Sequence, residues 1–380
     1  MELTEYIGSL KTPCYYYDIA LLRKTLETVT GELKKYKDYQ VHYAIKANAN
    51  PVLLKLIASY GLGADCVSGN EIQRAIECGF PPEKIVYAGV GKSDWEIETA
   101  LNNNIFCFNC ESVPEIEIIN EIAARMNKKA RIALRINPNI DAHTHQYITT
   151  GTEESKFGIY IYDIEKVIAL LKTCNSLELI GLHFHVGSQI TEMEVFQKLS
   201  ETANDIQQQL AKEEIELGHI NFGGGLGIDY QSPYNEPIAD FANYFATFAD
   251  YFEQQAGQKV HFELGRAIIA HCGDLISKVL YVKESRTKKF AVLDAGMNDL
   301  LRPALYQAFH KIENISSDKP EEIYDVVGPI CESSDFFGKN IRMNAVSRGD
   351  IVVVHTAGAY GETMSSRYNL RELPLSYFSE

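Results

Sequence analysis

The sequence lacks an apolar run long enough to cross a lipid bilayer, and its first residues contain neither a basic leader nor an extended apolar core. We therefore expect no transmembrane helix and no secretory signal peptide. Positive charge is also scarce, because 36 lysines and arginines stand against 51 acidic residues, for a formal net charge of −15. This balance argues against nucleic acid or an anionic membrane as a partner, so any anionic ligand must be held by local contacts.

A disulfide framework is absent as well, since the eight cysteines are scattered along the chain. Scattered cysteines are typical of reduced thiols in the cytoplasm, where we expect the protein to reside. Cys107 and Cys110 have CxxC spacing, but no second such pair accompanies them. They are therefore more typical of small packing residues at a strand end than of a zinc or redox site.

Short apolar runs alternate with longer helix-like runs over most of the chain. The strand candidates are 41–45, 63–67, 85–88, 105–108, 131–136, 180–186, 219–222 and 259–263. The helix candidates between them are 51–60, 68–78, 93–102, 113–127, 164–174, 191–213 and 238–255. Strands that alternate with helices pair in parallel, and eight such steps predict an α/β fold of the (β/α)8 or TIM-barrel type. A doubly wound open sheet is the alternative.

The pattern changes from about Arg266 onward, where turn residues separate strand-like runs and helices are scarce. These runs are 276–284, 289–293, 324–327 and 350–356. They predict a second, all-β domain of the barrel or sandwich type, into which an early strand at 13–17 can pair. The expected domains are therefore a barrel over 19–265 and a β domain made of 1–18 and 266–380.

Lys46 ends the first strand of the predicted barrel. Active sites of such barrels form at the carboxyl ends of the strands. A lysine there loses hydration, so its amine is easier to deprotonate, and a neutral amine forms Schiff bases with carbonyls. A lysine that merely extends from a strand end into solvent is the alternative.

Glycines follow the seventh strand, in the run Phe222-Gly-Gly-Gly-Leu-Gly227. The spacing matches neither a dinucleotide fingerprint nor a P-loop. Residues without side chains let backbone N–H groups approach a phosphate, and phosphate often binds after the seventh strand of such barrels. A plain tight turn would have the same sequence.

Two histidines, His183 and His185, stand two residues apart at the end of the sixth strand, so on a strand they face the same way. They fit either a metal pair or an imidazole stacked on a planar cofactor ring, with Ser188 reaching a phosphate. We favour the ring, and expect no metal, because the further ligands of a metal site are not evident at other strand ends. Buried structural histidines are the plain alternative.

Glu263 ends the eighth strand, where a carboxylate can pair with a protonated pyridine nitrogen and make the ring a strong electron sink. A structural pair with Arg266 is the alternative. An amine, a stacking imidazole, a phosphate cradle and this carboxylate at one barrel mouth together predict pyridoxal 5′-phosphate as the cofactor.

The β domain adds a possible carboxylate-binding guanidinium at Arg302, a thiol at Cys331, and a phenol at Tyr360 between glycines. A free buried cysteine is the alternative for Cys331.

The chain closely resembles the diaminopimelate decarboxylases, a family of alanine-racemase-like, fold type III pyridoxal-phosphate enzymes. The motifs that carry this resemblance are Tyr43-Ala-Ile-Lys-Ala-Asn48, His183-Phe-His-Val-Gly-Ser-Gln189, Gly223-Gly-Gly-Leu-Gly227, Asp294-Ala-Gly-Met-Asn298, Arg302-Pro-Ala-Leu-Tyr306, Cys331-Glu-Ser-Ser-Asp335 and Ala357-Gly-Ala-Tyr-Gly361. The resemblance implies an N-terminal (β/α)8 barrel with a C-terminal β domain.

The resemblance also implies a role for each matching residue. Lys46 is the Schiff-base lysine, His185 stacks on the ring, and Glu263 pairs with the ring nitrogen. The phosphate is held by Ser188, Gly224 and Gly225. The remaining residues that contact cofactor or substrate are Arg266, Arg302, Tyr306 and Tyr360. Cys331 and Glu332 come from the neighbouring subunit of a homodimer with shared active sites.

The reaction implied is decarboxylation of meso-2,6-diaminopimelate to L-lysine, the last step of lysine biosynthesis, with Cys331 as the first candidate to reprotonate the carbon. A decarboxylase of the ornithine or arginine type would share the cofactor residues, and Arg302 favours a substrate with a distal carboxylate. Glu263 argues against a racemase, and a non-catalytic module that binds the cofactor remains a further alternative. The chain departs from the family pattern at Leu264, where proline is usual, which bears only on the rigidity of that turn. It also departs over 368–374, so the last strand or helix of the β domain is expected to be shortened.

Overall fold

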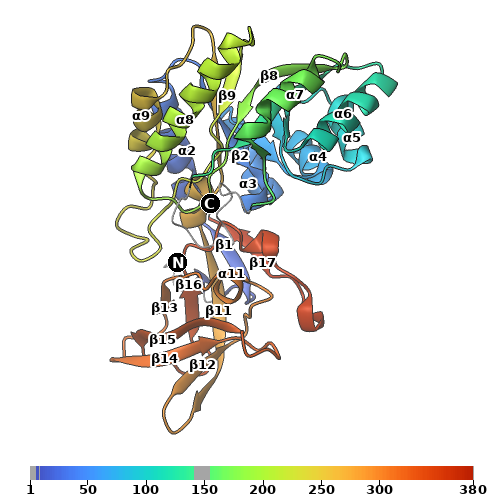
Figure 1. Cartoon of the computed structure of the whole chain (residues 1–380). Coiled ribbons are helices and arrows are strands. Elements are labelled where there is room, and N and C mark those ends of the chain that lie inside the picture. Colours follow the sequence, from blue (N-terminus) through green and yellow to red (C-terminus); the bar gives the residue numbers. More distant parts are fainter. Residues whose placement is uncertain (1–5, 8, 141–154, 380) are drawn as a thin grey trace. The chain divides into compact units, whose positions relative to one another are not determined.

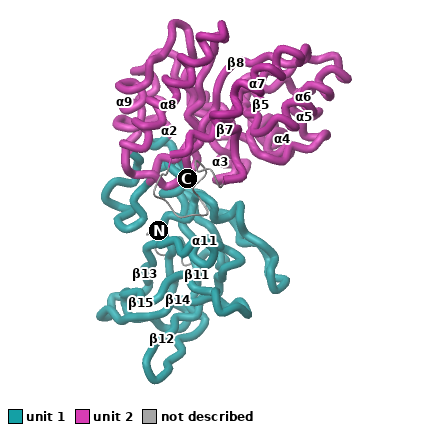
Figure 2. Tube along the Cα trace, viewed as in Figure 1, with its two compact units in different colours: residues 1–25, 228–239, 266–380 teal, residues 26–227, 240–265 magenta. Residues whose placement is uncertain are grey.

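The computed structural model describes residues 6–7, 9–140 and 155–379. The chain forms two compact units: unit 1 contains residues 1–25, 228–239 and 266–380, and unit 2 contains residues 26–227 and 240–265 (Figure 2). The first five residues, part of the stretch on which we expected no signal peptide, lie outside the described residues. No helix within the described residues is long and apolar enough to cross a membrane. The domain boundaries expected from the sequence stay a prediction.

Unit 2 is a closed barrel of eight parallel strands (Figure 1). The strands are β2 (Tyr39–Ala44), β3 (Gly63–Cys66), β4 (Ile85–Tyr87), β5 (Cys107–Cys110), β6 (Ala130–Asn137), β8 (Leu177–His183), β9 (His219–Asn221) and β10 (Lys259–Leu264). The last strand, β10, pairs in parallel with the first, β2, which closes the ring. A short strand, β7 (Ile159–Tyr160), pairs with β6. The (β/α)8 barrel is confirmed, and the open-sheet alternative is wrong.

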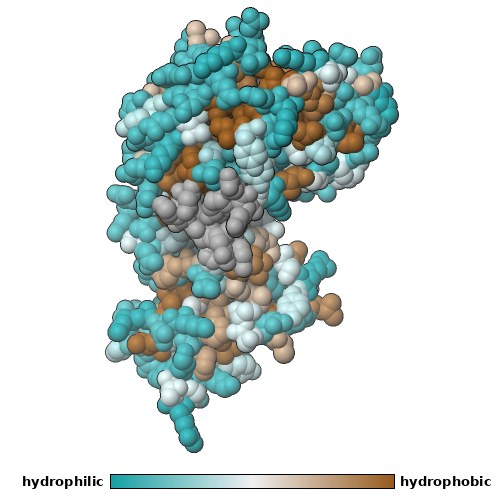
Figure 3. Space-filling view, viewed as in Figure 1, coloured by the Kyte–Doolittle hydropathy of each residue, from teal (hydrophilic) through white to brown (hydrophobic). Residues whose placement is uncertain are grey.

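Helices precede or follow the barrel strands in the sequence and cover the outside of the ring. They are α2 (Ile19–Leu33), which crosses the boundary between the units, α3 (Pro51–Ser59), α4 (Gly69–Glu77), α5 (Asp94–Asn102), α6 (Val113–Arg125), α7 (Ile164–Leu171), α8 (Met193–Lys212) and α9 (Phe241–Tyr251). Side chains cap several of them at the first turn, as Ser68 does for α4 and Ser112 for α6, and each such cap contributes about 1 kcal/mol. The outer surface of these helices is largely hydrophilic, with apolar residues visible between them (Figure 3).

The barrel interior contains three buried histidines, His42, His219 and His261, where branched apolar residues are usual. The His261 ring lies 4.8 Å from the His42 ring and 5.0 Å from the His219 ring. Glycines make room for them, because a Cβ atom on Gly63 would come within 2.4 Å of His42, and one on Gly181 within 2.4 Å of His219. His219 stands two residues before Asn221 in β9, and His261 stands two residues before Glu263 in β10. The barrel interior is therefore polar in more than one layer of side chains.

Unit 1 is built on a mixed sheet with the strand order β13-β16-β11-β12-β14-β15, to which β1 and β17 are joined. Its strands are β1 (Cys14–Tyr17), β11 (Gly273–Glu284), β12 (Lys289–Leu293), β13 (Ile312–Asn314), β14 (Glu321–Val327), β15 (Phe336–Asn344), β16 (Ile351–Val354) and β17 (Leu375–Phe378). The early strand β1 pairs antiparallel with β11 and parallel with β17. A separate β domain is thereby confirmed, and the structure pairs β1 into its sheet.

Candidate active site

Lys46 follows β2 in a single 3-10 turn, Ile45–Ala47. Its Nζ atom lies 3.0 Å from Oδ2 of Asp65, which stands on the neighbouring strand β3. The Lys46 side chain is 36% exposed, whereas that of Asp65 is fully buried. Burial and the charge of Glu263 raise the pKa of Asp65, and Lys46 opposes this shift. The lysine is therefore held inside the barrel mouth by a buried acid rather than extending freely into solvent.

Glu263 is a buried carboxylate with three hydrogen-bond donors. Its Oε1 atom accepts from the Asn221 amide at 2.7 Å and from the Asn109 amide at 3.1 Å. Its Oε2 atom lies 3.0 Å from Nε2 of His183. Burial alone would raise the pKa of Glu263, but the contact with His183 and the charge of Lys46 lower it well below its ordinary value. The side chain is therefore an anion at neutral pH.

The glycine run after β9 forms a tight turn against the end of β8. Gly223 has a φ of +69°, and a Cβ atom there would come within 2.2 Å of the Phe184 carbonyl oxygen. The Gly224 N–H donates to Nδ1 of His185 at 3.1 Å. Burial, together with the cations Arg135 and Lys46, lowers the pKa of His185 well below its usual range, so the ring is neutral.

The expectation that His183 and His185 share one strand is wrong, because β8 ends at His183. Its partner strand β9 ends at Asn221, directly opposite His183, and the glycine turn begins there. The two rings consequently serve different neighbours: His183 contacts Glu263, and His185 contacts the glycine turn. Ser188 lies three residues further along the same loop and is half-buried.

Unit 1 brings three of its predicted residues together around Tyr230. Arg266 donates from Nη1 to the Tyr230 hydroxyl at 2.6 Å, and its guanidinium lies 5.0 Å from the Tyr360 ring. The Arg302 guanidinium lies 4.9 Å from the Tyr230 ring and 2.8 Å from Nε2 of His310. Both arginines are buried. Tyr306, half-buried, lies with Arg302 on the short helix α11 (Arg302–Tyr306).

Cys331 and Glu332 make different contacts. The Cys331 N–H donates to Oδ1 of Asn369 at 3.1 Å, and the Tyr368 hydroxyl donates to the Glu332 carboxylate. Cys331 is the exposed cysteine of the eight, so the alternative of a buried structural thiol is wrong. Cys107 and Cys110 are buried in β5, in agreement with packing.

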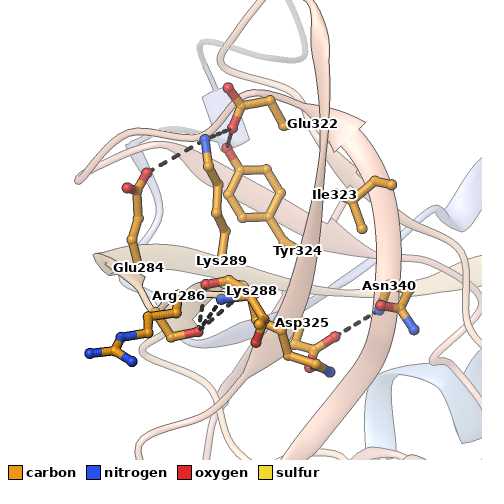
Figure 4. Close-up of a pocket in the computed structure, with 11 residues that line it drawn as sticks. Glu284, Arg286, Lys288, Lys289, Glu322, Ile323, Tyr324, Asp325 and Asn340 are labelled. Atoms are coloured by element: carbon orange, nitrogen blue, oxygen red, sulfur yellow. Dashed lines mark hydrogen bonds and ion pairs between the residues drawn. The ribbon is translucent and has the colours of Figure 1, made fainter.

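A second polar cluster of unit 1 pairs its charged side chains with one another. A hollow of about 710 Å³ in unit 1 lies beside the turn between β11 and β12 (Figure 4). Lysines in it are engaged by acids: Lys288 pairs with Asp325 at 2.5 Å, and Lys289 pairs with Glu322 at 2.6 Å. Within the described residues, no group of three or more histidine, cysteine and acidic side chains is arranged to hold a metal ion.

Sequence reasoning missed Asp65, Asn109 and Asn221, and it did not assign His183 to Glu263. Asp65, Asn109, Asn221 and His183 are polar residues at or near the carboxyl ends of barrel strands. That position was the available signal. The sequence prediction at this position concerned the CxxC spacing of Cys107 and Cys110 and not Asn109 between them.

Comparison with known proteins gives one consistent result. The family model of the pyridoxal-dependent decarboxylase pyridoxal-binding domain matches residues 21–270. The diaminopimelate decarboxylase of Bacteroides thetaiotaomicron is 57% identical over 98% of this chain and 96% of its own length. That of Aquifex aeolicus is 39% identical over 98% of this chain and 87% of its own. The crystal structure of diaminopimelate decarboxylase from Helicobacter pylori, complexed with L-lysine, superposes with a TM-score of 0.93 at 40% identity over 99% of this chain and 93% of that one. The chain belongs to the pyridoxal-dependent decarboxylases, and within them to the family of diaminopimelate decarboxylases.

Proposed function

We propose that this chain uses pyridoxal 5′-phosphate to decarboxylate meso-2,6-diaminopimelate, releasing L-lysine and carbon dioxide. One observation carries the proposal. A single barrel holds the amine of Lys46 together with Glu263, a buried carboxylate kept ionised by three donors. The two relatives and the crystal structure described above are all named diaminopimelate decarboxylase.

The residues of the barrel fit this cofactor. Glu263 offers a negative charge to a protonated ring nitrogen, and neutral His185 offers an aromatic face. The turn at Gly223 admits only glycine, because its φ is positive and a Cβ atom would strike the backbone. Oδ1 of Asp65 is buried and has no hydrogen-bond partner among the described residues, which leaves an unused acceptor beside the Lys46 amine.

Lys46 is the residue that attaches the cofactor. When bound, pyridoxal phosphate supplies an aldehyde that condenses with amino groups and a ring that accepts the electron pair left by departing carbon dioxide. The Lys46 amine must lose a proton before it can act as a nucleophile. Asp65, 3.0 Å away and with a raised pKa, is placed to accept that proton and to return it.

The other barrel residues orient and stabilise. Glu263 keeps the ring nitrogen protonated, which requires that the carboxylate itself stay ionised. His185 would lie against the ring face, and Ser188, Gly224 and Gly225 would hold the phosphate. The Gly224 N–H already donates to His185, so its share in phosphate binding requires that this hydrogen bond be exchanged or shared.

Substrate recognition is assigned to the arginine group of unit 1. The planar guanidinium of Arg302 suits a carboxylate, and Arg266 is the second cation of the group. Tyr306 and Tyr360 complete this group, and the family resemblance assigns Tyr360 and Arg266 to cofactor binding as well. Diaminopimelate carries a distal carboxylate that ornithine lacks, so an arginine selects for it.

Cys331 and Glu332 are assigned to the active site of a neighbouring subunit, which makes the working unit a homodimer with shared sites. Cys331 is exposed, and its backbone contact is with Asn369 rather than with the arginine group. In this arrangement the Cys331 thiol delivers the proton that replaces carbon dioxide, and Glu332 contacts the substrate.

A cytoplasmic location completes the proposal. It is supported by the eight cysteines, which are all free thiols and are typical of a reducing compartment.

A panel of amino acids tests the substrate. Purified protein with pyridoxal phosphate should release carbon dioxide from meso-diaminopimelate faster than from ornithine, arginine or lysine. Arg302→Lys serves as a probe of the distal carboxylate, because lysine lacks the bidentate geometry. Faster release from ornithine than from meso-diaminopimelate in the wild type would show that the substrate assignment is wrong.

A further inference from the structure

Asn221, the last residue of β9, makes three hydrogen bonds to three different parts of the barrel mouth. Its side-chain N–H donates to Oε1 of Glu263 at 2.7 Å. Its side-chain Oδ1 accepts from the N–H of Gly223 at 2.9 Å. Its backbone carbonyl accepts from the Phe184 N–H at 2.7 Å. One fully buried residue therefore connects the carboxylate, the glycine turn and the segment that leads to His185.

The side-chain chemistry of Asn221 is specific to an amide. A carboxamide donates from nitrogen and accepts at oxygen, so it can satisfy an anion on one side and a backbone N–H on the other. An apolar side chain of the same size does neither, and would leave the Gly223 N–H buried and unpaired. A buried donor without a partner is costly, so the turn would move to find another acceptor.

The glycine turn cannot move without its neighbours, because it lies against the backbone of Phe184 and of Glu263. A Cβ atom on Gly223 would come within 2.2 Å of the backbone carbonyl oxygen of Phe184. A Cβ atom on Gly224 would come within 2.1 Å of the backbone carbonyl oxygen of Glu263. Gly223 also accepts from the Glu263 N–H at 2.7 Å. Loss of the hydrogen bond from the Gly223 N–H would therefore also disturb the backbone that carries Glu263.

We propose that Asn221 is a positioning residue that fixes the carboxylate for the ring nitrogen and the glycine turn for the phosphate at the same time. This inference rests on the proposed cofactor. Asn109 is the matched comparison, because its amide donates to the same Glu263 oxygen at 3.1 Å but makes no hydrogen bond to the glycine turn within the described residues.

The test compares Asn221→Leu with Asn109→Leu. Binding of pyridoxal phosphate and of pyridoxal, which lacks the phosphate, is measured on each apo-protein by fluorescence. Because the two ligands differ only in the phosphate group, the ratio of their dissociation constants measures the contribution of phosphate binding alone. Hydrogen–deuterium exchange of the peptide that contains Gly223 reports the turn without any cofactor.

Asn221→Leu should lower the preference for pyridoxal phosphate over pyridoxal by about tenfold or more, the range for a buried backbone N–H that loses its acceptor. It should also accelerate exchange at Gly223. Asn109→Leu should leave both the ratio and the exchange near wild type, and both variants should weaken pyridoxal binding. Equal ratios in the two variants would overturn the inference while leaving the proposed function intact.

Two further outcomes are decisive. A wild-type protein that binds neither compound would reject the proposed function itself. If Asn221→Leu does not fold, Asn221→Ala removes the same amide without added volume. Failure of both to fold, with Asn109→Leu folded, would make Asn221 a residue of the barrel's stability and would overturn the positioning role.

Discussion

Acid should destabilise the barrel through its buried histidines. Burial is the largest cause that lowers the pKa of His42 from 6.5 to about 4 and the pKa of His219 from 6.5 to about 3. Between those values and 6.5, the unfolded chain binds protons at these positions and the folded barrel does not. Their stabilising effect is therefore complete above pH 6.5 and is lost as the pH falls toward the folded pKa values.

The size of the loss follows from the two pKa values. Each pH unit in that window costs about 1.4 kcal/mol per histidine. Between pH 7 and pH 5, His42 and His219 together should remove about 4 kcal/mol from the free energy of unfolding. The pKa of His261 is also lowered, again chiefly by burial, and acts in the same direction. Urea denaturation followed by far-UV circular dichroism at the two pH values measures the difference.

The variant His219→Gln isolates one contribution. It should reduce the loss between pH 7 and pH 5 by about 2 kcal/mol, whatever it does to stability at pH 7. His355→Gln is the control, because Asp274 and Glu313 outweigh burial and raise the pKa of His355. That variant should not reduce the acid loss. An acid loss in His219→Gln equal to that of wild type would refute the reasoning.

Three further predictions concern the active site. Borohydride should fix the cofactor covalently in wild type and not in Lys46→Ala, and covalent cofactor found by mass spectrometry in that variant would reject Lys46 as the attachment point. Asp65→Asn should slow cofactor attachment by at least about tenfold, because the amide cannot accept the lysine proton, and a stopped-flow rate equal to wild type would exclude Asp65 as the base. Mixing inactive Lys46→Ala with inactive Cys331→Ala should restore roughly a quarter of wild-type activity after random subunit exchange. No recovery, with exchange proven by differently tagged subunits, would place each site within one chain.

The barrel could be predicted from the sequence because its signals are local. Short, largely apolar runs alternate with helix-like runs along this part of the chain, and the order of pairing follows from the alternation. Lys46 and Glu263 could be found for the same reason, since each stands at the end of a strand whose place in the ring was known. Parallel strands then bring such ends together without further information.

The partners of those residues could not be predicted, because they depend on contacts between distant strands. Asn109 and Glu263 are 154 residues apart, and His183 and Glu263 are 80 apart. An asparagine in a strand is ambiguous by itself, and only the closed ring aims the side chains of β5, β8 and β9 at the same carboxylate.

The β domain was harder to predict for a related reason. β15 alternates poorly, with Gly338 and several polar residues, and the short strand β17 is defined by its pairing with β1, more than 350 residues earlier in the chain. The arginine group of the β domain also depends on Tyr230. This residue lies between β9 and α9 in the sequence, and no sequence pattern there indicated that it belongs to the β domain.

The hydrogen-bond donors to Glu263 determine how well this carboxylate can bind a cationic ring. Two of the three donors to this carboxylate are neutral amides, from Asn109 and Asn221. Neutral donors stabilise an anion without cancelling its charge, whereas a bonded arginine or lysine would compete with a cationic ligand for it. The lysine of the mouth is instead paired with a second acid, Asp65. Asp65 and Glu263 thus have different partners: Asp65 engages Lys46, and Glu263 is left with a negative charge that, in the proposed function, would pair with a ring nitrogen.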